Sequence, residues 1–356
     1  MIGYLFLGFA GSVAGIELAS RIYHRIHFGV PFHSKIIGEY PYSRFLEKTD
    51  PPLYWVLKKN FHHPLININR FRCRGPEPAP DGEKKRLLLI GESTFFGVKL
   101  LKEKYLWSIR LQKILEREGR HEWEIINAGN PTYNSFQHRI LWERELRKIK
   151  PDILLIEIGG NDITQAWMMG SKWKPGTPWP WEFVMALERK SPWWNKILGR
   201  FCAYYLIRRS ATERKGFPRL DEEYKLKECV SSIEENFKII VEDAIKMGTK
   251  VAIINLPYAI DPDIDDKDAR ALDTIQSNWR KIWEERGKYD IFMITLFSEI
   301  LPKRLNLPLI DVYSPIHGHQ NRYELFLDIF HLNKKGMKVI ADVIYRDIDR
   351  IGWWNR

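Results

Sequence analysis

Three side chains of this chain have the types and the order needed for nucleophilic acyl transfer. Ser93 follows a short apolar run, and Asp328 and His331 lie near the C-terminus, three residues apart. A serine hydroxyl is a weak nucleophile unless a base takes its proton, and His331 can serve as that base. Asp328 can hold the imidazole in the required tautomer and stabilise the imidazolium. The three residues therefore predict a Ser–His–Asp triad.

Acyl transfer also needs hydrogen-bond donors aimed at the oxyanion of the tetrahedral intermediate. The candidates are the backbone N–H groups of Ser93 and Gly129 and the side-chain amide of Asn161, in the segments GESTFFG, NAGNPTYNS and GGND. Glycine at position 129 allows the backbone to approach closely. Taken singly, these residues also suit turns, helix caps and core positions, so the prediction depends on their coincidence.

The elements that must position these residues are short apolar runs typical of strands buried on both faces. Such runs occupy residues 87–90, 124–127, 153–158, 251–254 and 309–312. Apolar residues at helical spacing over 233–245 and 340–348 alternate with them. The alternation predicts an α/β fold, a flavodoxin-like three-layer sandwich with a central parallel five-stranded sheet. Ligands bind at the carboxyl ends of such strands, where the candidate residues follow.

The combination resembles the SGNH (GDSL-like) hydrolase family, whose name lists the catalytic Ser, Gly, Asn and His of four motif blocks. The blocks correspond here to Ser93, Gly129, Asn161 and His331, and the resemblance covers roughly residues 85–350. It implies a serine esterase that needs no cofactor or metal. The first block of the family usually reads Gly-Asp-Ser, whereas this chain has Glu92. The extra methylene moves the carboxylate by about 1.5 Å. We expect Ser93 to keep its place, although the activity could be reduced.

Other motifs are weaker. The α/β-hydrolase elbow G-x-S-x-G is absent because position 95 is Phe, and the segment 91–99 fails the spacing of a phosphate loop. His317 and His319 could hold a metal, but the sequence indicates no third or fourth ligand. Basic and aromatic residues could suggest nucleic acid, but no nucleic-acid-binding signature accompanies them, so none is predicted as a partner. Tyr133 and Asn134 either line the pocket or turn the chain.

The N-terminus predicts a membrane anchor. Residues 1–16 carry no charged side chain, and residues 1–20 reach the lower length limit of a single-pass transmembrane helix. A cleaved signal peptide and a buried core helix are the alternatives. Gly11 and Gly15 form a GxxxG motif that could bring two such helices together as an oligomer. The family resemblance implies an extracytoplasmic catalytic domain, but Arg21 and Arg25 follow the segment and favour a cytoplasmic one.

Composition limits the remaining choices. The charged residues number 56 Lys+Arg and 45 Asp+Glu, and the net charge of +11 favours acidic partners. Three scattered cysteines exclude a disulfide framework.

The predicted division is an anchor over 1–20, a juxtamembrane segment and linker over 21–84, and a catalytic domain over 85–350. An insertion over 165–227 is rich in tryptophan and basic residues. It is either a packed helical cap or a lid that contacts sugar or lipid.

Three functions are compatible with these observations. The first is hydrolysis of an O-acyl ester of a carbohydrate or lipid through an acyl-enzyme on Ser93. The second uses the same triad to transfer an acyl group to a cell-surface glycan, with water excluded by the insertion. The third is a non-catalytic anchored binding module, which only Glu92 supports.

Overall fold

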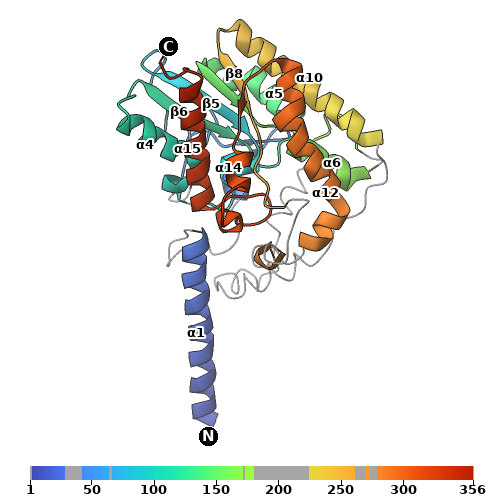
Figure 1. The fold of residues 1–356 in the computed structure, drawn as a ribbon. Coiled ribbons are helices and arrows are strands. Elements are labelled where there is room, and N and C mark those ends of the chain that lie inside the picture. The colour runs from blue at the N-terminus through green and yellow to red at the C-terminus, as the bar shows by residue number, and fades with distance from the viewer. Residues whose placement is uncertain are drawn as a thin grey trace.

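A parallel sheet of five apolar strands forms the centre of the structure (Figure 1). The strands are β5 (Lys85–Gly91), β6 (Trp123–Gly129), β7 (Ile153–Ile156), β8 (Lys250–Ile254) and β9 (Leu309–Ile310). Their order across the sheet is β6-β5-β7-β8-β9, so the second strand along the chain lies outside the first. This is the flavodoxin-like order. The five predicted strands and the parallel sheet are confirmed.

The structure is a computed structural model. It describes residues 2–28, 42–63, 66–100, 102–170, 173–179, 224–260, 269–272 and 279–355.

Helices cover both faces of the sheet, as the burial of the strands requires. On one side α4 (Trp107–Arg117) packs against α15 (Lys334–Arg350), and on the other α10 (Tyr224–Lys246) packs against α5 (Ser135–Arg144) and α6 (Gly160–Met169) (Figure 1). Because both faces are covered, the side chains of residues 87–90 in β5 are fully buried. The remaining elements after the sheet begins are α3 (Ser93–Phe96), η1 (Glu103–Tyr105), η2 (Leu146–Ile149), α12 (Trp279–Thr295), η4 (Leu296–Ile300), α13 (Leu301–Leu305), α14 (Tyr313–His317) and η5 (Arg322–Leu325).

The strand register brings the ends of three strands to one level. Gly91 at the end of β5 pairs with Gly129 at the end of β6, and Ile90 pairs with Ile156 in β7. The order of the strands reverses between β5 and β7, and such a switch point is where open parallel sheets bind ligands. The segments that follow these strands therefore meet at one edge of the sheet.

The N-terminal helix α1 (Ile2–Phe28) extends beyond the predicted anchor and projects away from the sheet (Figure 1). It contains an ion pair between Glu17 and Arg21 at 2.7 Å. No helix in the described part of the chain is long and apolar enough to cross a membrane, and the anchor over residues 1–20 stays a prediction. The side chains of residues 1–7, 9 and 10 lie outside the described residues. Pairing through Gly11 and Gly15 stays a prediction.

Two small hairpins precede the sheet. After α2 (Tyr42–Phe45), β1 (Leu46–Lys48) pairs with β2 (Trp55–Leu57), and β3 (Phe61–His63) pairs with β4 (Ile66–Ile68), both antiparallel. Isolated bridges join Arg74 to Ile68 and to Asn127 of β6. The segment thus covers the outer edge of β6, an edge that would otherwise expose unpaired backbone groups.

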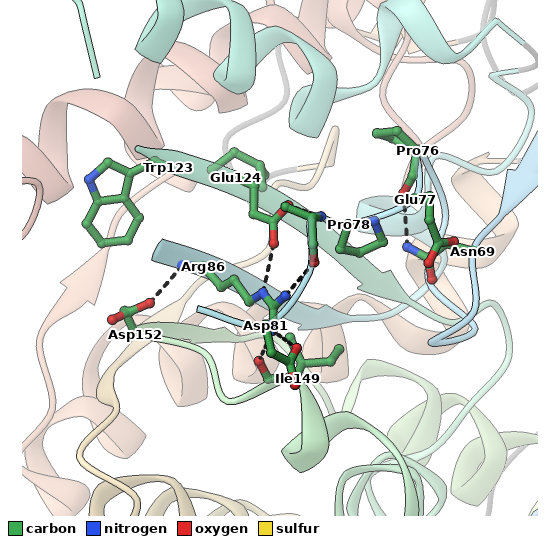
Figure 2. Close-up of polar contacts among 12 residues, drawn as sticks. Asn69, Pro76, Glu77, Pro78, Asp81, Arg86, Trp123, Glu124, Ile149 and Asp152 are labelled. Carbon is green, nitrogen blue, oxygen red and sulfur yellow. Dashed lines mark hydrogen bonds and ion pairs between the residues drawn. The ribbon is translucent and has the colours of Figure 1, made fainter. Parts of the chain in front are cut away.

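The proline-rich run over residues 75–82, at the end of the segment predicted as juxtamembrane segment and linker, is bound to the sheet through Arg86 (Figure 2). Arg86 lies on β5 and its side chain is only 3% exposed. Its guanidinium forms ion pairs with Glu124 at 2.7 Å and Asp81 at 2.8 Å, and donates hydrogen bonds to the carbonyls of Ala79 at 2.7 Å and Ile149 at 2.8 Å. Residues 79–81 are therefore part of the folded body rather than a free tether.

Most of the predicted insertion lies outside the described residues, because residues 180–223 are not among them. The tryptophans of its described part, Trp167, Trp173 and Trp179, are buried and belong to the core. This agrees with the packed interpretation for these three positions. The lid interpretation stays a prediction that concerns the residues outside the description.

Replacing Arg86 with alanine is expected to lower the free energy of unfolding by about 3 kcal/mol, because Glu124 then loses the partner that compensates its burial. Urea denaturation of the full-length protein measures the change. Arg117→Ala is the matched control, since the Arg117 side chain is 72% exposed. It should cost less than about 0.5 kcal/mol. Equal stability of the two variants would contradict a structural role for the Arg86 network.

Candidate active site

The four-residue helix α3 holds Ser93 at the carboxyl end of β5. Glu92 separates strand and helix, and Ser93 is the first helical residue. Phe95 and Phe96 are fully buried and anchor the helix, and the ring of Phe95 lies edge-on against Trp107 at 6.2 Å. Gly97 ends the helix in the left-handed conformation, φ +79°, which glycine adopts without steric cost. The Ser93 hydroxyl is therefore presented from a rigid, tightly turned segment.

The structure brings Ser93, His331 and Asp328 into one hydrogen-bonded chain. Nε2 of His331 lies 2.9 Å from the Ser93 Oγ, and Nδ1 lies 2.9 Å from both carboxylate oxygens of Asp328. The imidazole ring thus lies between the Asp328 carboxylate and the Ser93 hydroxyl, which is the position that a general base requires. Ser93 and His331 are half-buried, and Asp328 is buried. A reactant can reach the serine, while the carboxylate is shielded from water.

Asp328 is held ionised by its surroundings. Its Oδ1 accepts hydrogen bonds from the backbone N–H groups of Phe330 at 2.9 Å and His331 at 2.8 Å. Its Oδ2 forms an ion pair with Lys99. Burial by itself would raise the pKa of Asp328, but His331 and Lys99 outweigh it and hold the pKa well below its usual range. A charged carboxylate is the form that can stabilise an imidazolium.

The predicted oxyanion donors lie at the same sheet edge, but two of them have intramolecular acceptors. The Gly129 N–H donates to Oδ1 of Asn127 at 3.0 Å, and Nδ2 of Asn161 donates to the Tyr133 carbonyl at 2.9 Å. The Ser93 N–H has no acceptor among the described residues. The Ser93 N–H and the second N–H of the Asn161 amide can therefore bind an oxyanion directly, whereas the Gly129 N–H must share or exchange its hydrogen bond.

Glycine at 129 is required by packing against the nucleophile helix. A Cβ atom there would lie 2.4 Å from the backbone nitrogen of Phe96 and 2.7 Å from its Cα. Backbone atoms cannot rotate away as a flexible side chain can, so any larger residue would displace α3. Gly129 therefore sets how closely β6 and the Ser93 helix approach each other.

Glu92, where the resembled family usually has Asp, links the first and third motif segments. Its Oε1 accepts the N–H groups of Gly159 at 2.8 Å and Asn161 at 2.9 Å, and its Oε2 also accepts that of Asn161 at 2.9 Å. The longer side chain thus reaches the backbone that leads into α6. Glu92 holds the Asn161 segment beside the nucleophile, and it leaves the Ser93–His331 hydrogen bond intact.

A second buried acid, Glu157, lies behind this contact and was not predicted. Its Oε2 accepts the N–H of Glu92 at 2.9 Å, whereas Oε1 has no hydrogen-bond partner among the described residues. Burial raises the pKa of Glu157 to about 8, and burial together with Glu157 raises the pKa of Glu92 well above its usual range. The only sequence signal was one acidic residue within the apolar run 153–158.

The third segment is also tied to α5. Asp162 accepts hydrogen bonds from the Ser135 N–H at 2.7 Å and the Ser135 hydroxyl at 2.6 Å. Asn134 caps α5 by accepting the Gln137 N–H at 2.9 Å, and the Tyr133 hydroxyl is buried and donates to the Trp55 carbonyl. Of the two alternatives for Tyr133 and Asn134, the structure favours a role in turning and capping the chain.

The weaker metal candidates have other partners. His317 Nδ1 lies 3.1 Å from a guanidinium nitrogen of Arg322, and His319 Nδ1 accepts the Asn321 N–H at 3.1 Å. The described part of the chain holds no cluster of three His, Cys, Asp or Glu residues that could bind a metal ion.

No protein-family model and no curated protein matches the chain. Among solved structures, it is similar to a lipase/acylhydrolase from Enterococcus faecalis, with 17% identity over 75% of this chain and 96% of that chain and a TM-score of 0.46. A GDSL-like lipase from Bacteroides thetaiotaomicron is 14% identical over 76% of this chain and 91% of that chain, with a TM-score of 0.42. An acetyl xylan esterase is 15% identical over 74% of this chain and 99% of that chain, with a TM-score of 0.43. Similarity this low does not decide the activity, so the functional conclusion depends on the chain's own site.

Glu157→Gln is expected to reduce the loss of stability with rising pH. The folded protein holds the Glu157 proton up to about pH 8, whereas the ordinary value is 4.5. Between these limits the unfolded chain binds fewer protons, so the free energy of unfolding falls as pH rises, by at most about 1.4 kcal/mol per pH unit for one group. Urea denaturation at several pH values from 5 to 8 measures the slope.

The control for this experiment is Glu122→Gln, the same chemical change at an exposed position. It should leave the slope unchanged. A Glu157→Gln slope identical to that of the wild type would show that Glu157 is ionised in the folded protein.

Proposed function

We propose that the chain is a serine ester hydrolase of the SGNH type, with Ser93, His331 and Asp328 as its triad. The single observation that carries this proposal is the continuous Ser93–His331–Asp328 hydrogen-bonded chain at the switch point of a parallel sheet. Two further observations support it. The hydroxyl is half-buried and within reach of a substrate, and the carboxylate is buried and ionised.

In the proposed reaction the Ser93 oxygen attacks the ester carbonyl while Nε2 of His331 takes the hydroxyl proton. The tetrahedral intermediate collapses, and the proton passes from His331 to the leaving alcohol. Water, deprotonated by Nε2 of His331, then attacks the acyl-enzyme, and His331 returns this proton to the Ser93 oxygen as the acid is released. Asp328 keeps the ring oriented and stabilises the imidazolium in both halves. No cofactor or metal is required in this sequence of steps.

The oxyanion would be bound first by the Ser93 N–H. The second N–H of the Asn161 amide would join it, since only the first donates to the Tyr133 carbonyl, and the Gly129 N–H would join when it shares or exchanges its present acceptor, Asn127 Oδ1. Catalytic hydrogen bonds often tighten only in the substrate complex. Their intramolecular bonds in the structure are therefore compatible with a role in the transition state.

Hydrolysis is favoured over acyl transfer and over a non-catalytic role. The His331 side chain is 18% exposed, so solvent water can reach the acyl-enzyme. An intact triad argues against a module that merely binds. The substrate class, an O-acyl ester of a carbohydrate or lipid, rests on the basic and tryptophan-rich composition of residues 165–227.

A fluorophosphonate probe is expected to modify Ser93 in the wild-type protein, because the probe reacts with serines whose proton is taken by a base. Peptide mass spectrometry locates the adduct without any assumption about the substrate. His331→Ala should abolish the modification, and Ser135→Ala, which alters a buried serine outside the triad, should keep it if the variant folds. A folded wild-type protein that takes no adduct on Ser93 would refute the proposal.

Asn161→Ala is expected to lower kcat for p-nitrophenyl acetate by about 10²–10³-fold, because it removes one oxyanion donor. The loss of the hydrogen bond to the Tyr133 carbonyl should also cost about 1 kcal/mol of stability. Thr164→Ala on the same helix removes a side-chain hydrogen bond to a backbone carbonyl and serves as the control. Full activity of Asn161→Ala would exclude Asn161 from the oxyanion site.

A further inference from the structure

The triad carboxylate has a second charged partner besides the histidine. The ammonium group of Lys99 forms an ion pair with Oδ2 of Asp328, the oxygen that also lies 2.9 Å from His331 Nδ1. The Asp328 side chain is 8% exposed and that of Lys99 is 29% exposed. An ion pair with one partner this deeply buried is less screened than a surface pair. A continuous series of contacts, one ion pair followed by hydrogen bonds, therefore runs from Lys99 through Asp328 and His331 to Ser93.

Lys99 is held in place by a backbone conformation that its residue type seldom adopts. Its φ is +68°, in the left-handed region that non-glycine residues rarely occupy. Such conformations persist only when the surrounding structure imposes them, and they cluster at functional sites. The turn over residues 97–100 is closed by a hydrogen bond from the Leu100 N–H to the Gly97 carbonyl at 3.0 Å.

A buried arginine imposes this turn. The guanidinium of Arg74 donates to the carbonyls of Phe96 and Gly97, both at 2.8 Å, and also to that of Leu100. Arg74 is 1% exposed and comes from the segment that covers the edge of β6. One side chain thus ties together the end of the Ser93 helix and the turn that carries Lys99. Lys99 is positioned by the same rigid contact as the nucleophile.

We infer that Lys99 is a positioning residue of the proposed active site: its ammonium group orients the Asp328 carboxylate toward His331 and shifts the acid limb of the activity profile to lower pH. The inference rests on the proposed function. It adds a fourth side chain to the three of the triad, one that acts through Asp328 and does not touch the reacting atoms.

The direction of the shift follows from charge. When His331 accepts the serine proton, an imidazolium forms next to Asp328. Lys99 has already neutralised part of that carboxylate's field and repels the new cation. The imidazolium is therefore less stable with Lys99 present than without it, which places the acid limb of the activity profile at lower pH.

The other charged or titratable groups near residues 328–331 have partners outside the Asp328–His331 pair. The elements around residues 328–331 carry Glu92 before α3, Tyr258 after β8, Glu324 on η5 and Lys334 at the start of α15. Glu92 binds the Asn161 segment, Glu324 pairs with Lys335, and the ammonium of Lys334 lies 6.0 Å from the ring centre of Tyr105. The Tyr258 ring packs edge-on against Phe330. Among the described residues, only Lys99 pairs with the Asp328–His331 unit.

The test is the second-order rate of Ser93 modification by a fluorophosphonate, measured from pH 4 to 9 on the full-length protein. Lys99→Met removes the charge but keeps an unbranched side chain, so the cost of the left-handed backbone stays similar. Its acid-limb midpoint is expected to rise by about 0.5–1 pH unit, with a plateau rate about 3–10-fold lower because the carboxylate is less well oriented. Lys99→Arg should restore the wild-type midpoint.

Lys335→Met is the matched control. It removes the same charge four residues after His331, from a pair with Glu324 that is exposed on both sides. Its midpoint should stay within about 0.2 pH unit of the wild type. If Lys99→Met behaves like this control, or Lys99→Arg behaves like Lys99→Met, the inference is overturned.

Folding is followed by circular dichroism, with Lys99→Gln as a second charge-removing variant. If both charge-removing variants fail to fold while Lys335→Met folds, Lys99 is a stability element and the inference is wrong. A wild-type protein without an adduct on Ser93 would overturn the proposed function and this inference together. A wild-type adduct combined with an unshifted Lys99→Met profile would overturn the inference alone.

Discussion

The arrangement of the site depends on the fixed position of one short helix, α3. A helix of four residues cannot be stable by itself, because nucleation costs more than one turn of hydrogen bonds returns. Its place is set from outside. The backbone of Phe96 leaves no room for a side chain at position 129, Arg74 binds the carbonyls of Phe96 and Gly97, and Phe95 is buried against Trp107. Ser93 is thereby directed at His331 with little freedom to move.

Two groups of buried carboxyls flank this helix and are stabilised in opposite ways. Asp328 is surrounded by N–H donors and two basic side chains, so it stays ionised in spite of its burial. Within the described part of the chain no cation pairs with Glu92 or Glu157, and burial favours their protonated forms. The first arrangement supports an imidazolium next to the serine. The second ties the Asn161 segment to the residue before Ser93 through hydrogen bonds.

The segment before β5 makes contacts at both ends of the sheet. At the end that carries the candidate site, Arg74 reaches the turn after α3. At the opposite end, Arg86 binds residues 79–81 to β5 and β6 (Figure 2). A proline-rich composition predicted a linker because proline removes backbone donors and disfavours regular structure. In the folded chain the guanidinium of Arg86, which lies outside the run, donates hydrogen bonds to Ala79 and Asp81 within it. Composition alone does not reveal such a contact.

Local pattern alone was enough to predict the five strands and their parallel arrangement, and to indicate the residues of the proposed triad. Apolar runs such as residues 87–90 and 153–156 must be buried on both faces wherever they lie, and reactive side chains that follow such strands meet at one sheet edge. The contacts of Arg74, Lys99 and Glu157 were decided only by the tertiary structure. Each depends on a partner distant in sequence, and strand register and loop closure bring such partners together without leaving a periodic signal. For the same reason the sequence indicated which donors could bind an oxyanion, while the folded chain determined that the Gly129 N–H and one N–H of the Asn161 amide already have acceptors.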